Sequence, residues 1–126
     1  MSREIVQSDK APKAIGPYAQ AIKANGFVYT GGQIAIRPES GEIVDGGIKA
    51  QTRQVFENLA AVLQAAGTSG DQVVKATVFL RYMSDFAAMN EVYAEYLGRA
   101  TPARSTVAVS ELPRGALLEI DLIALA

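Results

Sequence analysis

The 126-residue sequence contains neither cysteine nor histidine. Without cysteine there can be no disulfide, no thiolate nucleophile and no sulfur-ligated metal. Without histidine the chain lacks the most frequent metal ligand and the most frequent general acid or base. Any chemistry must therefore use carboxylates, arginine, lysine, tyrosine, hydroxyls, backbone groups and water.

The sequence also lacks an excess of either charge, a long apolar run and an apolar leader. Lys and Arg number 12 against 13 acidic residues, a net charge of −1, and the basic residues are scattered. This balance disfavours binding to a nucleic-acid backbone or an anionic membrane. No run approaches the ~18 apolar residues of a membrane span, and residues 1–10 do not resemble a signal peptide. We expect one cytoplasmic domain spanning residues 1–126.

Turn-forming residues dominate the first part of the chain. Pro12, Gly16 and Pro17 predict an extended lead-in with turns over residues 1–18. The dipeptide Asn25-Gly26 separates two short apolar runs, 19–22 and 27–30, and accepts the positive φ values of a tight hairpin turn. The sequence therefore predicts two antiparallel strands here.

The middle of the chain changes from a strand-like to a helical period. Apolar residues at helical spacing from Ile48 to Ala66 predict an amphipathic helix that Gly67 ends. The nearly continuous apolar run in 71–81 predicts a central strand covered on both faces. A second helix is expected from Ser84 or Asp85 to Gly98.

Two final strands are predicted after Pro102, with a turn at 113–115 between them. The order β-β-α-β-α-β-β indicates an α+β fold in which two helices cover one face of a single mixed sheet. In 117–124 the even-numbered residues are apolar and should face the helices, while the odd-numbered ones face away. Because the second face mixes Leu and Ile with two carboxylates, a homo-oligomer is predicted to cover it.

Two charged residues fall on these final strands. The rigid fork of Arg104 can bind a carboxylate through two parallel hydrogen bonds. Alternatively, Arg104 is an ion-pair partner of Glu119 or Asp121 from its own or a neighbouring chain, and spacing alone leaves both possibilities open. Glu119 can likewise act as a general base that orients water, or only as an ion-pair partner.

Three other positions are candidates for a small-molecule site. Tyr18, beside a rigid turn, either hydrogen-bonds a ligand or closes the edge of the core. Gly32, in a Gly-Gly pair, either lets the backbone approach a ligand or only turns the chain. Phe86 either walls a pocket or packs its helix. Neither glycine-rich phosphate-binding pattern occurs.

Six ordered segments resemble the Rid/YjgF reactive-intermediate deaminases, also described as the endoribonuclease L-PSP family. The segments are Gly16–Gln20, Val28–Ile34, Gln54–Leu59, Met89–Tyr93, Pro102–Thr106 and Leu118–Asp121. The resemblance implies a chorismate-mutase-like fold assembled as a homotrimer with ligand clefts between subunits. It also implies hydrolysis, without cofactor or metal, of the enamine and imine acids that pyridoxal-phosphate-dependent serine and threonine dehydratases release.

The resemblance also assigns roles to single residues. Arg104 is expected to clamp the substrate carboxylate, and Glu119 to hold or activate the hydrolytic water. The other implied contacts are a hydroxyl hydrogen bond from Tyr18, polar contacts from Gly32 and the Thr106 backbone, and an apolar wall from Phe86. This Phe86 belongs either to the same subunit or to a neighbouring one.

The chain departs from the family pattern at two positions, with Thr106 where Cys is common and Ala19 where Ser is usual. Since attack by water needs no thiol, the change at 106 bears on oxidative regulation more than on hydrolysis. Two alternatives to a deaminase are a non-catalytic trimer that senses small carboxylates and, attached to the family by name, an endoribonuclease. The absence of histidine and of a basic track disfavours the latter.

Overall fold

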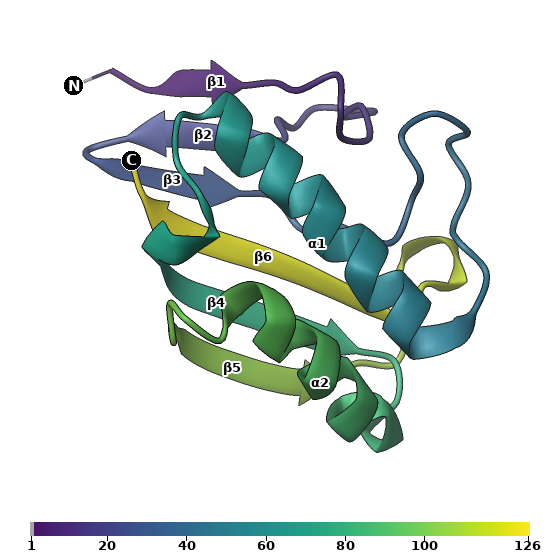
Figure 1. Ribbon diagram of the computed structural model, residues 1–126. Coiled ribbons are helices and arrows are strands. Elements are labelled where there is room, and N and C mark those ends of the chain that lie inside the picture. The colour runs from purple at the N-terminus through teal and green to yellow at the C-terminus, as the bar shows by residue number, and fades with distance from the viewer. Residues whose placement is uncertain (1) are drawn as a thin grey trace.

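The computed structural model describes residues 2–126. Six strands form one mixed sheet in the order β1-β2-β3-β6-β4-β5 (Figure 1). The strands are β1 Glu4–Val6, β2 Ala21–Ala24, β3 Phe27–Thr30, β4 Val73–Leu80, β5 Ala103–Ala108 and β6 Leu118–Leu125. The helices are α1 Gly47–Ala65 and α2 Phe86–Leu97, with short 3-10 turns η1 Gly70–Gln72, η2 Met83–Asp85 and η3 Pro113–Gly115. Within residues 2–126 no helix is long and apolar enough to cross a membrane.

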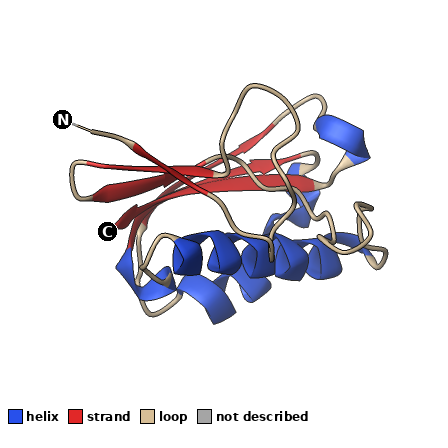
Figure 2. Ribbon diagram, turned by 90° about the horizontal axis from the view of Figure 1, so that it is seen from above, coloured by secondary structure: helices blue, strands red, loops and turns tan. Residues whose placement is uncertain are grey.

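Both α-helices lie on one face of the sheet, and in Figure 2 the other face carries no α-helix, with only one short 3-10 turn beside it at one end. The α+β architecture with two helices on one face is therefore confirmed. The predicted alternation along β6 is also confirmed, because its even-numbered residues are buried and the odd-numbered ones from 117 to 123 are partly exposed. The buried set is Leu118, Ile120, Leu122 and Ala124. They meet the apolar faces of the helices in one core.

Two predictions about strands were wrong. Residues 4–6 were expected in an extended lead-in but form β1, which pairs antiparallel with β2 and buries Val6. The open edge of β2 supplies unpaired backbone groups that a short segment can bind. Strand β4 was expected to be covered on both faces, yet its burial alternates and Val74 is 39% exposed. Helices cover one side only, so the apolar residues on the other side remain accessible within one chain.

The hairpin and the helix ends follow their local signals. Asn25 and Gly26 have φ values of 53° and 82°, as the predicted turn requires. Helix α1 ends just before Gly67, and Gly98 is the C-cap of α2. Asp85 occupies the N-cap of α2 but makes no side-chain capping hydrogen bond.

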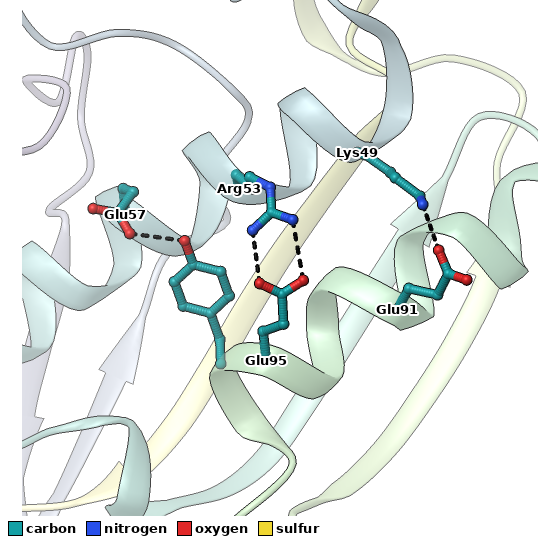
Figure 3. A network of polar contacts seen from close by, with 6 residues as sticks. Lys49, Arg53, Glu57, Glu91 and Glu95 are labelled. Atoms are coloured by element: carbon teal, nitrogen blue, oxygen red, sulfur yellow. Dashed lines mark hydrogen bonds and ion pairs between the residues drawn. The ribbon is translucent and has the colours of Figure 1, made fainter.

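A ladder of polar contacts joins the exposed sides of α1 and α2 (Figure 3). Lys49 pairs with Glu91, and the guanidinium of Arg53 donates two hydrogen bonds to Glu95 at 2.8 and 3.0 Å. The Tyr96 hydroxyl donates to Glu57 at 2.8 Å. Arg53 holds the pKa of Glu95 below its usual value through this hydrogen bond. These contacts are exposed to solvent and add little to the apolar packing that holds the two helices together.

Candidate active site

The six candidate residues fall into two groups that lie apart in one chain. Phe86, Arg104 and Thr106 lie where α2 meets the edge strand β5. Tyr18, Gly32 and Glu119 lie on the helix-free side, around β6 and the segment that follows β3. We call these groups the arginine half-site and the glutamate half-site.

The register of the sheet sends Arg104 toward α2. Arg104 lies beside Ala76 in the parallel β4–β5 ladder, and Ala76 is buried beneath the helices. The Nη1 of Arg104 donates to Oδ1 of Asn90 at 2.6 Å. Its guanidinium carbon lies 4.5 Å from the ring centre of Tyr93 and 5.3 Å from that of Phe86. Helix α2 thus holds the arginine by one amide and two aromatic rings.

Arg104 forms no ion pair within residues 2–126. Pairing with Glu119 or Asp121 of its own chain, one of the two structural alternatives, is therefore wrong. Asn90 accepts one hydrogen bond of Arg104 through its neutral amide oxygen. Since an amide oxygen carries no formal charge, the guanidinium keeps its positive charge uncompensated and suited to an anionic ligand.

Sequence reasoning did not single out Asn90. It lies in the segment Met89–Tyr93, which carried part of the family resemblance, and precedes Tyr93 by three residues. Residues three apart on a helix share a face. The three-residue spacing of Asn90 and Tyr93 was the signal in the sequence that both side chains contact the same neighbour, Arg104.

Thr106 lies two residues beyond Arg104 on the same side of β5. Its backbone pairs in register with Val78 of β4, which is fully buried. The Thr106 hydroxyl is buried and has no hydrogen-bond partner within residues 2–126, and the same is true of the Tyr93 hydroxyl. Two unsatisfied hydroxyls therefore accompany the arginine, one on each element that forms its half-site.

In the glutamate half-site, the carboxylate of Glu119 lies directly against Gly32. Backbone hydrogen bonds in both directions join Gln33 to Ile120, at 2.9 and 3.1 Å, and bring Gly32 beside the helix-free face of β6. A Cβ at position 32 would overlap the carboxylate, Cδ and Cγ of Glu119. Glycine is required here by space, because only a hydrogen side chain lets the carboxylate take this place.

Burial raises the pKa of the Glu119 carboxyl above its usual value, and the negative charge of Asp121 adds to the rise. A carboxyl whose pKa moves toward neutrality accepts and returns protons more readily at physiological pH. Burial likewise raises the pKa of Asp121, which Thr77 and Lys75 oppose. The pKa of Glu119 is thus shifted in the direction that favours a general base.

A pocket of about 270 Å³ opens at Glu119. Glu119, Gly32 and Tyr18 line it together with Arg114 of η3 and apolar side chains such as Ile36. Tyr18 is largely exposed at this pocket, and its hydroxyl accepts the backbone N–H of Ile15 at 3.3 Å. A wider hollow of about 510 Å³ beside β1 also includes Tyr18 but neither Glu119 nor Arg104. Of these two hollows, only the smaller is lined by a carboxyl of raised pKa, that of Glu119.

Residues 2–126 contain no group of three or more acidic side chains that could hold a metal ion. The groups available for chemistry around the two half-sites are the guanidiniums of Arg104 and Arg114, the carboxyls of Glu119 and Asp121, hydroxyls and backbone amides.

Gly32→Ala is expected to lower activity at this site on the order of tenfold, because the added methyl displaces the Glu119 carboxylate from its position. The overlapped atoms belong to a flexible side chain, so the fold should persist. Steady-state kinetics with a thermal melt measures both effects. Gly70→Ala is a matched control, since a Cβ there meets no atom closer than 3.5 Å. Unchanged kinetics for Gly32→Ala would contradict the role of Glu119.

Known proteins resemble the chain along nearly its whole length. The family model described as endoribonuclease L-PSP matches residues 8–126. A RutC family protein of Pyrococcus horikoshii is 57% identical over 122 residues, 97% of each chain. The 2-iminobutanoate/2-iminopropanoate deaminase of Mus musculus is 43% identical over 97% of this chain and 90% of the mouse protein. The crystal structure of E. coli TdcF with bound serine matches with a TM-score of 0.92, at 40% identity over 98% of both chains. All six candidate residues lie within the region that the family model matches.

Proposed function

We propose that this chain, which belongs to the Rid/YjgF (endoribonuclease L-PSP) family, hydrolyses 2-iminopropanoate and 2-iminobutanoate to the corresponding 2-oxo acids and ammonia. These imines arise from the enamine acids that pyridoxal-phosphate-dependent serine and threonine dehydratases release. The mouse relative carries the name of this activity. A carboxylate-binding arginine and a carboxyl of raised pKa are the two groups that the hydrolysis needs.

The observation that carries the proposal is the arrangement of the two half-sites. Arg104 is held by α2 at the edge strand β5, whereas Glu119 lies on β6 and faces the helix-free side. Strand β4 separates these two strands in the sheet. A small imino acid does not span that separation within one chain. In our proposal, a second subunit brings its Glu119 beside Arg104.

We place the completed site in a cleft between neighbouring subunits of a homotrimer. The helix-free face suits such an assembly because apolar side chains remain accessible on it. They are Tyr29, Phe79, Val107 and Ile123. Covering them with another subunit removes apolar surface from water and brings the glutamate half-site of one subunit toward the β5 edge of the next.

The reaction then proceeds by addition and elimination at the imine carbon. Arg104 binds the substrate carboxylate through two hydrogen bonds and fixes the imine beside Glu119. Protonation of the imine nitrogen makes its carbon electrophilic. Glu119 accepts a proton from water while the water oxygen attacks, which gives a carbinolamine. Glu119 returns that proton to the nitrogen, ammonia leaves, and the carbonyl forms as the hydroxyl loses its proton. One imine and one water give one 2-oxo acid and one ammonia.

The test is release of 2-oxo acid from imine that a dehydratase generates in the same cuvette. Because such imines hydrolyse spontaneously, the measured quantity is the acceleration over the reaction without this protein. We expect a clear acceleration, together with a mass near three times 13.3 kDa by light scattering. A monomer, or a rate equal to the spontaneous one, would contradict the proposal.

A further inference from the structure

The hydroxyl of Tyr93 is buried without a hydrogen-bond partner within residues 2–126. Tyr93 is only 7% exposed. Its ring packs edge-on against Phe56 of α1, with ring centres 5.7 Å apart. This packing uses the ring alone, and phenylalanine would provide it without burying a polar atom. An unsatisfied buried hydroxyl opposes folding, so its presence calls for a reason other than packing.

The polar group beside the Tyr93 ring is the guanidinium of Arg104. Its guanidinium lies over the Tyr93 ring at 4.5 Å. Burial raises the pKa of the Tyr93 phenol, and the nearby Arg104 opposes that rise. The phenol therefore stays protonated at neutral pH, and its oxygen lies near the guanidinium as a neutral acceptor.

A guanidinium carries five N–H donors in one rigid plane. Asn90 accepts one of them. A single acceptor leaves the plane free to rotate about that bond, whereas two acceptors on the same side fix it. Tyr93 follows Asn90 by three residues on α2, so both side chains approach Arg104 from the same helix face.

We infer that Tyr93 is a positioning residue for Arg104: its ring supports the guanidinium, and its hydroxyl accepts an N–H of Arg104 when a carboxylate is bound. With Asn90 and Tyr93 each accepting one N–H on the protein side, three N–H groups remain, and two of them form the pair that points to the ligand. The inference rests on the proposed carboxylate clamp. The Tyr93 hydroxyl thereby has a role in ligand binding, whereas packing of the core uses only the ring.

Tyr93→Phe tests the hydroxyl alone, since the ring and its contacts remain. We expect the Kd for 2-oxobutanoate, measured by NMR titration, and the KM for the imine to rise about five- to tenfold. The Tm should stay the same or rise, because the unsatisfied hydroxyl is gone. Tyr96→Phe is the matched control: it removes a hydroxyl that does have a partner, Glu57, outside both half-sites. It should lower the Tm slightly and leave Kd and KM unchanged.

A second measurement asks whether Tyr93 acts through Arg104. In an Arg104→Lys background, Tyr93→Phe should change kcat/KM less than about twofold, since lysine has no plane to orient. An undiminished effect in that background overturns the inference, because Tyr93 would then act on the ligand itself. Wild-type Kd and KM for Tyr93→Phe, whatever its Tm, overturn it as well. If the unmodified protein neither binds 2-oxobutanoate nor accelerates hydrolysis, the proposed function fails and the inference falls with it.

Discussion

Arg104→Lys is expected to lower kcat/KM for the proposed imine hydrolysis by about 100-fold or more, a loss of ~2.7 kcal/mol of transition-state stabilisation. Lysine keeps the charge but presents a point donor, so it cannot make the two parallel hydrogen bonds that fix a carboxylate. The loss should appear in both kcat and KM, because the arginine binds the substrate and also aligns the imine carbon with the water at Glu119.

The fold of this variant should survive. Arg104 is half-buried and makes no ion pair within residues 2–126, so no buried carboxylate is left unpaired when the guanidinium is removed. The lysine stem still covers the rings of Phe86 and Tyr93. A thermal melt that matches the unmodified protein, together with the kinetic loss, separates a functional from a structural role.

Arg99→Lys is the control, because Arg99 is exposed just beyond α2. It should behave as the unmodified protein in both measurements. If Arg104→Lys retains full activity at equal stability, Arg104 is not the carboxylate clamp. If it loses stability and activity together, the arginine is a structural residue of α2 and β5.

Local patterns in the sequence predicted the elements whose cause is local. The two residues at the hairpin turn and the alternation along β6 are properties of neighbouring residues, and both were confirmed. Strand β1 was not predicted, because a three-residue segment has little signal of its own and is stabilised by the edge of β2. The open face of β4 was also mispredicted, since composition does not tell which side a distant helix will cover.

The candidate site was likewise predictable from the sequence only in part. The motif resemblance pointed to Arg104 and Glu119, but their separation depends on the register of three strands. Arg104 is level with Ala76 of β4, which faces the helices, while Glu119 is level with Phe79, which faces away. Because 76 and 79 differ by an odd number, the two side chains leave the sheet on opposite sides. Whether the two side chains lie on the same side of the sheet depends on how strands far apart in the sequence pair. No local sequence pattern gives that pairing.

The separation of the half-sites leads to the second large effect that we predict, complementation between two inactive variants. If Arg104 is the proposed carboxylate clamp and Glu119 the proposed general base, Arg104→Ala and Glu119→Gln should each be nearly inactive alone. If the protein is a deaminase, the Glu119→Gln variant should still bind 2-oxo acids but no longer hydrolyse imines. If the protein is a carboxylate sensor, the same variant should keep both ligand binding and its output. When subunits of the two variants are mixed at random, a site is intact if its arginine and its glutamate come from the appropriate neighbours. About one quarter of all sites in a randomly assembled 1:1 mixture meet this condition.

Activity should therefore appear on mixing, at about a quarter of the unmodified level, after subunits are exchanged by unfolding and refolding or by co-expression. Native mass spectrometry confirms that mixed trimers have formed. If mixed trimers are present and activity does not return, the two residues do not meet across an interface.

The matched control mixes unmodified subunits with the double variant Arg104→Ala/Glu119→Gln. Here mixing lowers the activity instead of restoring it. If each subunit carried its own complete site, half of the sites in a 1:1 mixture would remain intact. If every site needs two neighbours, both must be unmodified, and about one quarter remain. Activity that falls to a quarter in this mixture, and rises to a quarter in the complementing one, identifies a shared site. Activity at half in this mixture and absent in the complementing one means that each site takes both residues from one subunit, and it contradicts the shared site.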